Sequence, residues 1–312
     1  SVVSSSRLPV PSQFELCRQF SSPSISTSSS RMVRFSRKLK IVVVPTAAIR
    51  VDTATVSSIR QVPGGSAANT AAWLGSMGVS VILAACVGVD DLARCTAELE
   101  AHGVTPRLTT SEAPTGAIVV LVEGDNRSML TSRGANADLR LGEVTNFGRH
   151  LHVTGHTLAA ADPSEFHDLI TRAVASGASV SVCPGSSAYI DDLGAEAFLG
   201  AIAGATVLIA SIGEGRALTG RTEAVDVEAA LLAHYPTVVL TLGSNGVLVD
   251  GVHVPAITAQ SADPTGAGDA FTAGFLAEWL QTGDLVSAAQ RGTEIAATAV
   301  ARVGGRPPHS AR

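Results

Sequence analysis

From residue 41 onward, short β-branched runs alternate with longer helical patterns. Ile41–Val44 is a continuous apolar run, which is typical of a strand buried on both faces of a parallel sheet. Similar runs follow at Val79–Ala84, Ala117–Val122, His150–Thr154, Ser179–Val182, Thr206–Ile209, Thr237–Leu242 and Gly246–Val249. Helical patterns separate most of them, at Ala67–Met77, Asp91–His102, Pro163–Ala175, Asp226–His234 and Ala267–Leu280. The alternation predicts an α/β domain with a mostly parallel central sheet flanked by helices.

Two stretches interrupt this alternation, at about residues 48–62 and 106–131. In the second, Thr/Val/Ile-rich segments are joined by Glu123-Gly124-Asp125-Asn126, and such a cluster between two strand-like runs predicts a hairpin. We expect both stretches to form a small β-strand lid over a site. The sequence gives no sign of a second domain, so we expect one domain over residues 41–306 and a short C-terminal tail at 307–312.

Residues 1–40 differ in composition from the rest of the chain. They are rich in Ser, hold seven basic residues and one acid, and lack hydrophobic periodicity, so we expect a poorly ordered tail. Two interpretations are open: an organellar transit peptide, or an extension ahead of an internal start at Met32. We favour the second, and with it a cytoplasmic location.

Composition excludes several classes of protein. Hydrophobic residues make up 46% of the 312 residues and charged residues 16%, which excludes a disordered chain. Residues 41–312 hold 15 basic and 26 acidic residues, and this negative balance disfavours binding to DNA or RNA. No apolar run reaches the length of a membrane helix. The four cysteines form no CxxC pair, which disfavours a zinc site and indicates a reducing compartment.

The only lysines are Lys38 and Lys40. A Walker A loop, a protein kinase and a pyridoxal or Schiff-base enzyme each need a lysine in the active site. Residues 41–312 can house none of these mechanisms.

The segment most informative about chemistry is Asp263-Pro-Thr-Gly-Ala-Gly-Asp-Ala-Phe271, which runs directly into an apolar-periodic stretch. A glycine-rich turn that opens a helix predicts an anion site, because its backbone N–H groups and the helix dipole both face the ligand. Asp269 would lie beside that anion, where a carboxylate weakens binding, so its presence suggests a general base. The alternative, that Asp269 only complements the helix dipole, stays open here.

This segment resembles the C-terminal signature of the ribokinase-like (PfkB-type) carbohydrate kinase family. Other segments resemble the family in the same order and span about residues 41–306. They are Gly64-Gly65-Ser66-Ala67-Ala68-Asn69, Gly134-Ala135-Asn136, Thr241 to Gly246, and the helix from Leu285 through Arg302 to Gly304.

The resemblance implies a kinase that transfers the γ-phosphoryl of ATP, with Mg²⁺, to a primary hydroxyl of a small sugar or nucleoside. The backbone amides of Gly266, Ala267 and Gly268 would hold the phosphoryl, and Asp269 would be the general base. Gly64, Gly65 and Asn69 would bind the acceptor, with a turn and helix start as the alternative reading. Thr241, Gly243, Gly246, Ser211 and Glu214 would bind the nucleotide. Glu214 would face Mg²⁺ indirectly, unless it is only a helix-start acid. K⁺ dependence and a homodimer are left open.

The sequence departs from the family after the first strand. Pro45 takes the place of a glycine, and Arg50 takes the place of an acid that binds sugar hydroxyls, although Asp52 could substitute. An arginine there would favour an anionic or carbonyl-bearing acceptor. Ser211 replaces an asparagine, and Cys183-Pro-Gly-Ser-Ser187 lacks the acid and arginine of several subfamilies.

Three functions therefore remain in competition. We favour an ATP-dependent sugar or nucleoside kinase. The departures motivate the main alternative, a weakly active or inactive sugar- or nucleoside-binding regulatory homologue. An NAD-dependent oxidoreductase rests only on the α/β character, and it lacks the dinucleotide fingerprint, which would need a glycine at Phe271.

Overall fold

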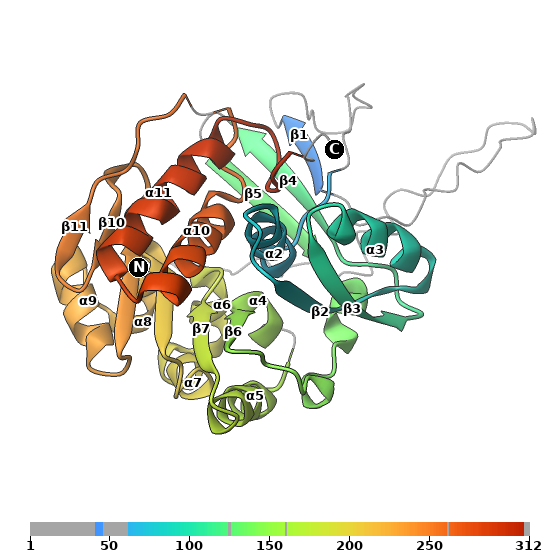
Figure 1. Cartoon of the computed structure of the whole chain (residues 1–312), viewed down its shortest axis with the longest axis horizontal. Helices are drawn as coiled ribbons and strands as arrows, with labels where there is room; N and C mark the ends of the chain where they lie inside the picture. Colours follow the sequence, from blue (N-terminus) through green and yellow to red (C-terminus); the bar gives the residue numbers. More distant parts are fainter. Residues whose placement is uncertain (1–40, 46–61, 124–125, 160, 261, 309–312) are drawn as a thin grey trace, which may run out of the picture. The chain divides into compact units, whose positions relative to one another are not determined.

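The computed structural model describes residues 41–45, 62–123, 126–159, 161–260 and 262–308 (Figure 1). The predicted N-terminal tail, and Arg50 and Asp52 with nearly all of the first predicted lid segment, lie outside this part of the chain. The strands are β1 (Ile41–Pro45), β2 (Val81–Gly88), β3 (Val104–Ser111), β4 (Ala117–Glu123), β5 (Asn126–Ser132), β6 (His150–Thr154), β7 (Ser179–Cys183), β8 (Val207–Ser211), β9 (Thr237–Thr241), β10 (Val247–Val249) and β11 (Val252–Val254). The α-helices are α2 (Ser66–Ser76), α3 (Leu92–Glu100), α4 (Gly155–Leu158), α5 (Pro163–Ala175), α6 (Ser187–Leu193), α7 (Ala195–Ala201), α8 (Ile212–Thr219), α9 (Ala224–Leu232), α10 (Ala267–Thr282) and α11 (Leu285–Val300).

The central sheet has six strands in the order β11-β10-β9-β8-β7-β6. The pairs β6–β7, β7–β8 and β8–β9 are parallel, whereas β10 pairs antiparallel with both β9 and β11. A hairpin at one edge of a parallel sheet is common in α/β proteins. The predicted α/β class with a mostly parallel central sheet is confirmed.

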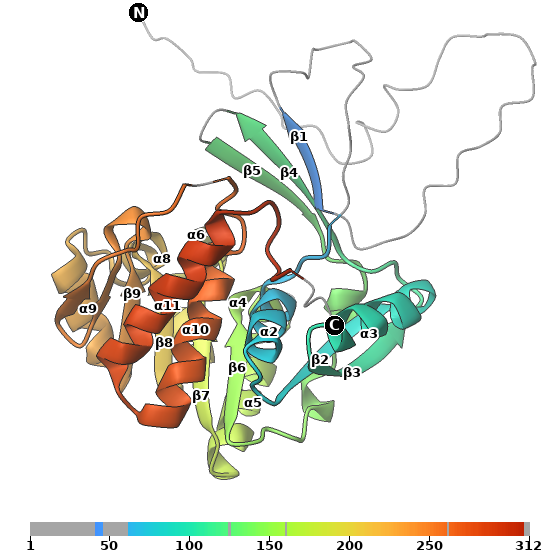
Figure 2. The ribbon, with the colours of Figure 1, turned by 45° about the horizontal axis from the view of Figure 1, so that its top comes forward.

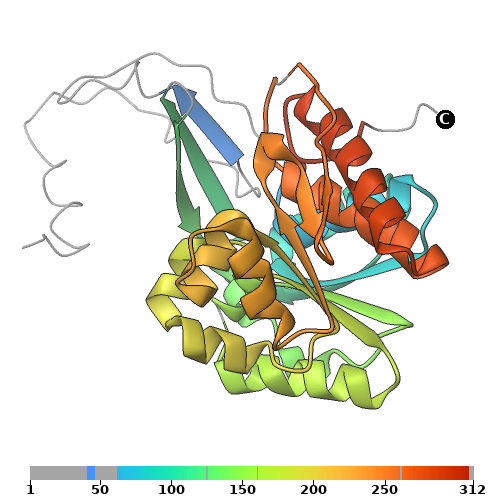
Figure 3. The ribbon, with the colours of Figure 1, turned by 90° about the vertical axis from the view of Figure 1, so that its left-hand side faces the viewer.

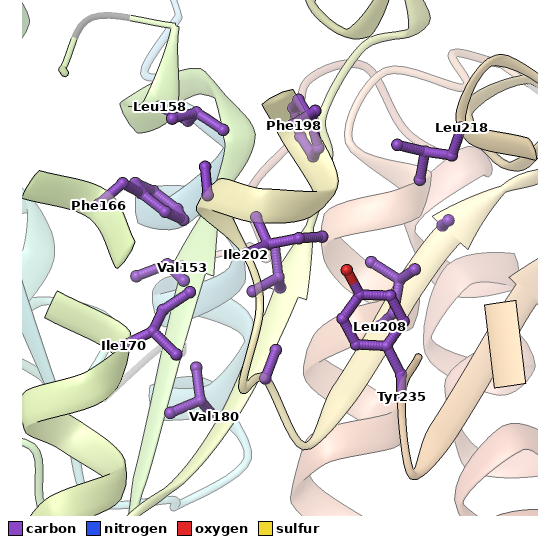
Figure 4. Close-up of a cluster of buried hydrophobic side chains, with 14 of the residues drawn as sticks. Val153, Leu158, Phe166, Ile170, Val180, Phe198, Ile202, Leu208, Leu218 and Tyr235 are labelled. Carbon is purple, nitrogen blue, oxygen red and sulfur yellow. The ribbon is translucent and has the colours of Figure 1, made fainter. Parts of the chain in front are cut away.

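Helices cover both faces of this sheet because successive strand residues point to opposite sides. Leu208, Val238 and Leu240 belong to a core with α5–α9, and Figure 4 shows Phe166, Ile170, Phe198 and Ile202 in it. Ile209 and Val239 belong to a second core with α2, α10 and α11. Figure 3 shows the red C-terminal helices and the yellow-green helices on opposite faces. Burial on both faces explains why these strands read as continuous apolar runs.

Three predicted strands lie outside the central sheet. β1 pairs in parallel with β4, and β2 pairs in parallel with β3 over its whole length. The expectation that the apolar runs share one sheet is therefore wrong for β1 and β2, whereas β4 belongs to the segment that we expected to stand off the central sheet. An apolar run specifies a strand but not its partner, which depends on contacts distant in sequence.

The predicted hairpin is present. β4 and β5 are antiparallel, with Ala117 opposite Ser132 and Glu123 opposite Asn126. Together with β1 they form a three-stranded sheet that stands off the six-stranded sheet (Figure 2). β3, which we placed in the same lid, pairs instead with β2. That the hairpin acts as a lid stays a prediction. Among the described residues, no helix has the length and apolarity needed to cross a bilayer.

Candidate active site

The glycine-rich turn before α10 is held by hydrogen bonds from its first residue. Asp263 accepts from the backbone N–H of Thr265 at 2.9 Å and from that of Gly304 at 3.1 Å. Gly266 follows with a φ of +79° and begins the helix, a conformation that glycine adopts without strain. The Ala267 N–H donates to the Pro264 carbonyl at 3.2 Å. The turn therefore directs the N-terminus of a 16-residue helix, with its positive dipole end, toward the space in front of it.

Asp269 lies in the first turn of α10 and is bound from α2. The Ser66 hydroxyl donates to Oδ1 at 2.6 Å, and the Asn69 side-chain N–H donates to Oδ2 at 2.8 Å. α2 begins at the predicted Gly64-Gly65 segment, with Gly65 at a φ of +94°. Both carboxylate oxygens are thus oriented by donors, as expected for a group that must face a substrate in one direction.

The packing of the two helices depends on a close approach of three backbones. A Cβ on Gly266 would lie 2.5 Å from the Gly305 Cα, and a Cβ on Gly305 would lie 2.6 Å from the Asn69 side-chain nitrogen. Trp73 of α2 fixes the same segment by donating its indole N–H to the Gly305 carbonyl at 3.0 Å. At Gly266 a side chain would collide with backbone, and at Gly305 it would displace the Asn69 side chain that binds Asp269.

The environment of Asp269 raises the pKa of its carboxyl to about 6. Loss of hydration is the larger cause and raises the pKa, while the hydrogen bonds from Ser66 and Asn69 lower it. Burial is the main reason that the pKa of the Cys183 thiol is raised, and the charges of Glu214 and Asp269 raise it further, so both carboxylates act on the same thiol. A carboxyl with a pKa just below neutrality is ionised at pH 7 and can still take up a proton, which suits a general base.

Two cavities meet at the start of α10. The first, which we call the α11 cavity, has a volume of about 440 Å³. It is lined by Thr241, Gly243, Ser244, Gly246, Ala256, Ile257, Thr258, Ala259, Pro264, Ala267, Gly268, Phe271, Thr293, Ala296, Ala297 and Val300. It contains three of the predicted nucleotide-binding positions, namely Thr241, Gly243 and Gly246. No charged side chain occurs among the described residues of its wall.

The second, which we call the α2 cavity, has a volume of about 420 Å³. The predicted acceptor-binding residues Gly64, Gly65 and Asn69 line it, together with Asp269. Its wall also includes the charged residues Glu98, Arg133 and Arg306, and the aromatic pair His156 and Tyr189, whose ring centroids are 5.3 Å apart. Gly268 lines both cavities, so both spaces border the first turn of α10.

Ser211 and Glu214, which we also assigned to the nucleotide, line neither cavity. They form a reciprocal cap at the start of α8, where the Ser211 N–H donates to Glu214 Oε2 at 2.7 Å and the Glu214 N–H donates to Ser211 Oγ at 3.3 Å. Burial raises the pKa of Glu214, and backbone N–H groups of Ser211 and Gly185 lower it. The helix-start alternative thus describes a real contact, and the role in binding ATP and Mg²⁺ stays a prediction.

Two residues of the α2 cavity were missed in the sequence. Ser66 has a local signal, because a serine beside two glycines at a helix start is placed to point out of the helix. Arg306 follows the expected closing helix, and its place in the cavity depends on the turn of the chain at Gly304 and Gly305. Arg50 and Asp52, which we expected to bind the acceptor, lie outside the described residues.

Comparison with known proteins identifies the family. The model of the pfkB family carbohydrate kinases matches residues 33–312, so the chain belongs to this family. The ATP-dependent ribose-1-phosphate kinase of Halopiger xanaduensis is 33% identical over 267 residues, which cover 81% of this chain and 85% of that protein. The crystal structure of adenosine kinase from Sinorhizobium meliloti aligns with a TM-score of 0.75 at 25% identity, over 80% of this chain and 81% of the other. The nucleoside kinase of Methanocaldococcus jannaschii, an archaeal member of the ribokinase family, aligns with a TM-score of 0.69 at 25% identity, over 85% and 89%.

These matches confirm the predicted family, the ribokinase-like fold and the use of ATP. The chain is a carbohydrate or nucleoside kinase, and a sugar or nucleoside is its class of acceptor.

Proposed function

We propose that this chain transfers the γ-phosphoryl group of ATP to a primary hydroxyl of a small sugar or nucleoside, with Asp269 as the general base. One observation carries the proposal: Asp269 is held by Ser66 and Asn69 in the wall of the α2 cavity, one residue from the glycine shared with the α11 cavity. A proton acceptor therefore lies where an acceptor hydroxyl in one cavity would meet a phosphate from the other.

The nucleotide would occupy the α11 cavity. Its apolar wall suits the nucleotide's purine or pyrimidine ring. Because the wall has no charged side chain among the described residues, the phosphates would be bound by the turn before α10. The N–H groups of Gly266 and Gly268 would hold the transferring phosphoryl with the helix dipole, whereas the Ala267 N–H already binds within the turn.

Mg²⁺ fits this arrangement. Glu214 is a half-buried carboxylate, and loss of hydration raises its pKa. It would face the metal indirectly, and Mg²⁺ would neutralise charge on the nucleotide phosphates.

The acceptor would occupy the α2 cavity, with Gly64, Gly65 and Asn69 around its hydroxyl groups. Ribose, ribose 1-phosphate and adenosine are the first acceptors to test, because relatives of this chain are named for such substrates.

The test is release of ADP from Mg²⁺-ATP by the wild type and by Asp269→Asn. We expect the variant to lose on the order of a thousandfold in turnover, as for removal of a general base, and to bind ATP as before in calorimetry. Asp284→Asn is the matched control, because Asp284 caps α11 through Val286 and Ser287 at the opposite end of α10. Equal turnover in Asp269→Asn and wild type would contradict the proposal.

A further inference from the structure

Arg306 lies in the wall of the α2 cavity, and two of its side-chain nitrogens have no hydrogen-bond acceptor among the described residues. Its side chain is 9% exposed, and Nη2 donates to the Gly64 carbonyl at 3.2 Å. Nε and Nη1 are buried without a hydrogen-bond acceptor among the described residues. Buried guanidinium donors without acceptors are costly, so an acceptor group that entered the cavity and reached the Arg306 guanidinium would be bound favourably.

The neighbouring charges only partly compensate Arg306. Glu98 Oε1 lies 3.4 Å from Nη1 without hydrogen-bonding geometry, and Glu98 Oε2 accepts from Arg94 at 3.3 Å. Arg94 pairs in turn with Asp91 at 3.0 Å. The charges of Arg306, Arg94, Glu98 and Asp91 sum to zero, but the Glu98 carboxylate is shared between the two arginines. Burial lowers the pKa of Arg306, which is the effect of incomplete compensation.

Arg306 is also within reach of the reaction centre. It binds the carbonyl of Gly64, and Ser66, two residues further on, binds Asp269 at 2.6 Å. Two residues of chain span at most about 7 Å. A small molecule with a hydroxyl at Asp269 can therefore extend a second polar group toward Arg306 within the same cavity, which both residues line.

We propose that Arg306 determines acceptor specificity by binding an anionic oxygen group, a phosphate or a carboxylate, that the acceptor carries in addition to its hydroxyl. Guanidinium is always charged, donates only, and makes its strongest hydrogen bonds to such groups. A neutral sugar hydroxyl can also accept a hydrogen bond, but it adds no charge to balance the guanidinium. The inference rests on the proposed function, because it assigns the acceptor to the α2 cavity.

The test compares Arg306→Gln with Arg94→Gln, which removes the same charge from the same cluster but does not line the cavity. The probes are ribose 1-phosphate, a keto-deoxy sugar acid and neutral ribose. We expect Arg306→Gln to raise the KM of the anionic acceptor about tenfold to a hundredfold, the loss typical of a charge-assisted hydrogen bond. The KM for ATP stays unchanged, and Arg94→Gln, which leaves Glu98 to pair with Arg306 alone, changes the KM of the acceptor less than Arg306→Gln does. The probe that loses affinity shows whether the anion is a phosphate or a carboxylate.

The inference is overturned if the enzyme phosphorylates only neutral acceptors, or if Arg306→Gln changes the KM of neutral and anionic acceptors alike. Arg306→Lys keeps the charge and is expected to give an intermediate KM. It replaces the glutamine variant if that variant does not fold. If no acceptor is phosphorylated, calorimetry with ribose 1-phosphate and the sugar acid separates the two proposals. Binding that is lost in Arg306→Gln upholds the inference while the kinase proposal fails, and absence of binding overturns the inference.

Discussion

The two cavities that meet at α10 have nearly the same volume and opposite chemistry. The α11 cavity, about 440 Å³, has small and apolar residues of α11 in its wall and no charged side chain among its described residues. The α2 cavity, about 420 Å³, includes Asp269, Glu98, Arg133 and Arg306. A site without charged side chains relies on backbone amides and a helix dipole for phosphates. Charged side chains, whose pKa values can be adjusted, are concentrated where the proposed reaction would move a proton.

This contrast agrees with a chain that has no lysine in its body. Residues 41–312 contain none, and the α11 cavity has no cationic side chain in its described wall. The charge of a nucleotide would then be met by Mg²⁺ and by the N-terminus of α10 rather than by a side chain. The two cavities can be perturbed separately because they share only Gly268 in their described walls.

Among variants that test the two cavities against each other, the largest effect is expected at Gly268, which both cavities share. Gly268→Ala adds a methyl group with no atom within 4 Å, so it occupies open space beside a residue that lines both cavities and leaves the fold intact. We expect turnover to fall on the order of a hundredfold, as when reacting groups are displaced by about 1 Å, with an unchanged melting temperature.

Gly266→Ala is the paired variant, because it adds the same methyl group two residues earlier in the chain. Its φ of +79° and the contact with Gly305 make it destabilising by about 1–3 kcal/mol. Thermal unfolding and ADP release are measured for both variants. A Gly268→Ala enzyme with wild-type turnover would show that the shared space is not the path of the phosphoryl group.

Some of this arrangement could be predicted from the sequence. α5 was predicted with its observed bounds because its signals are local: Asp162 caps the first turn by accepting from Ser164, and Pro163 occupies the first helical position. Asp269 was located by the glycine-rich turn before it. The short β11 and the short helices α6 and α7 were missed, because elements of this length carry too little periodicity.

The contacts that complete the candidate site lie beyond local patterns. The hydrogen bond from Ser66 to Asp269 joins residues 203 positions apart, and that from Arg306 to Gly64 joins residues 242 apart. Both require the segment at Gly305 to pass between α2 and α10. Such contacts are set by tertiary packing, which periodicity and turn signals do not encode.

A smaller effect, confined to the α11 cavity, is expected from Ala297→Leu. The added carbons occupy the apolar wall and should raise the KM for ATP about tenfold, equivalent to about 1.4 kcal/mol of lost binding. The KM for the acceptor should stay unchanged. Thr298→Leu is the control, because the next residue of α11 is exposed and does not line the cavity. Steady-state kinetics with both substrates varied tests this. Equal changes in the two KM values would mean that the cavities do not bind separate substrates.

The smallest effect is confined to the α2 cavity and concerns pH. The base acts in its ionised form, so kcat/KM should fall about tenfold per unit as the pH drops below the pKa of Asp269, about 6. The hydrogen bond from the Ser66 hydroxyl lowers that pKa. Ser66→Ala should therefore shift the acidic limb of the profile of kcat/KM against pH to higher pH by up to about one unit, the effect of one hydrogen bond. Ser76→Ala, which removes a hydroxyl bound to the Trp73 carbonyl at the other end of α2, should leave the limb in place. The measurement is kcat/KM for the acceptor between pH 5 and 9. An acidic limb that stays in place or moves downward in Ser66→Ala would mean that Asp269 is not the group whose ionisation controls the reaction.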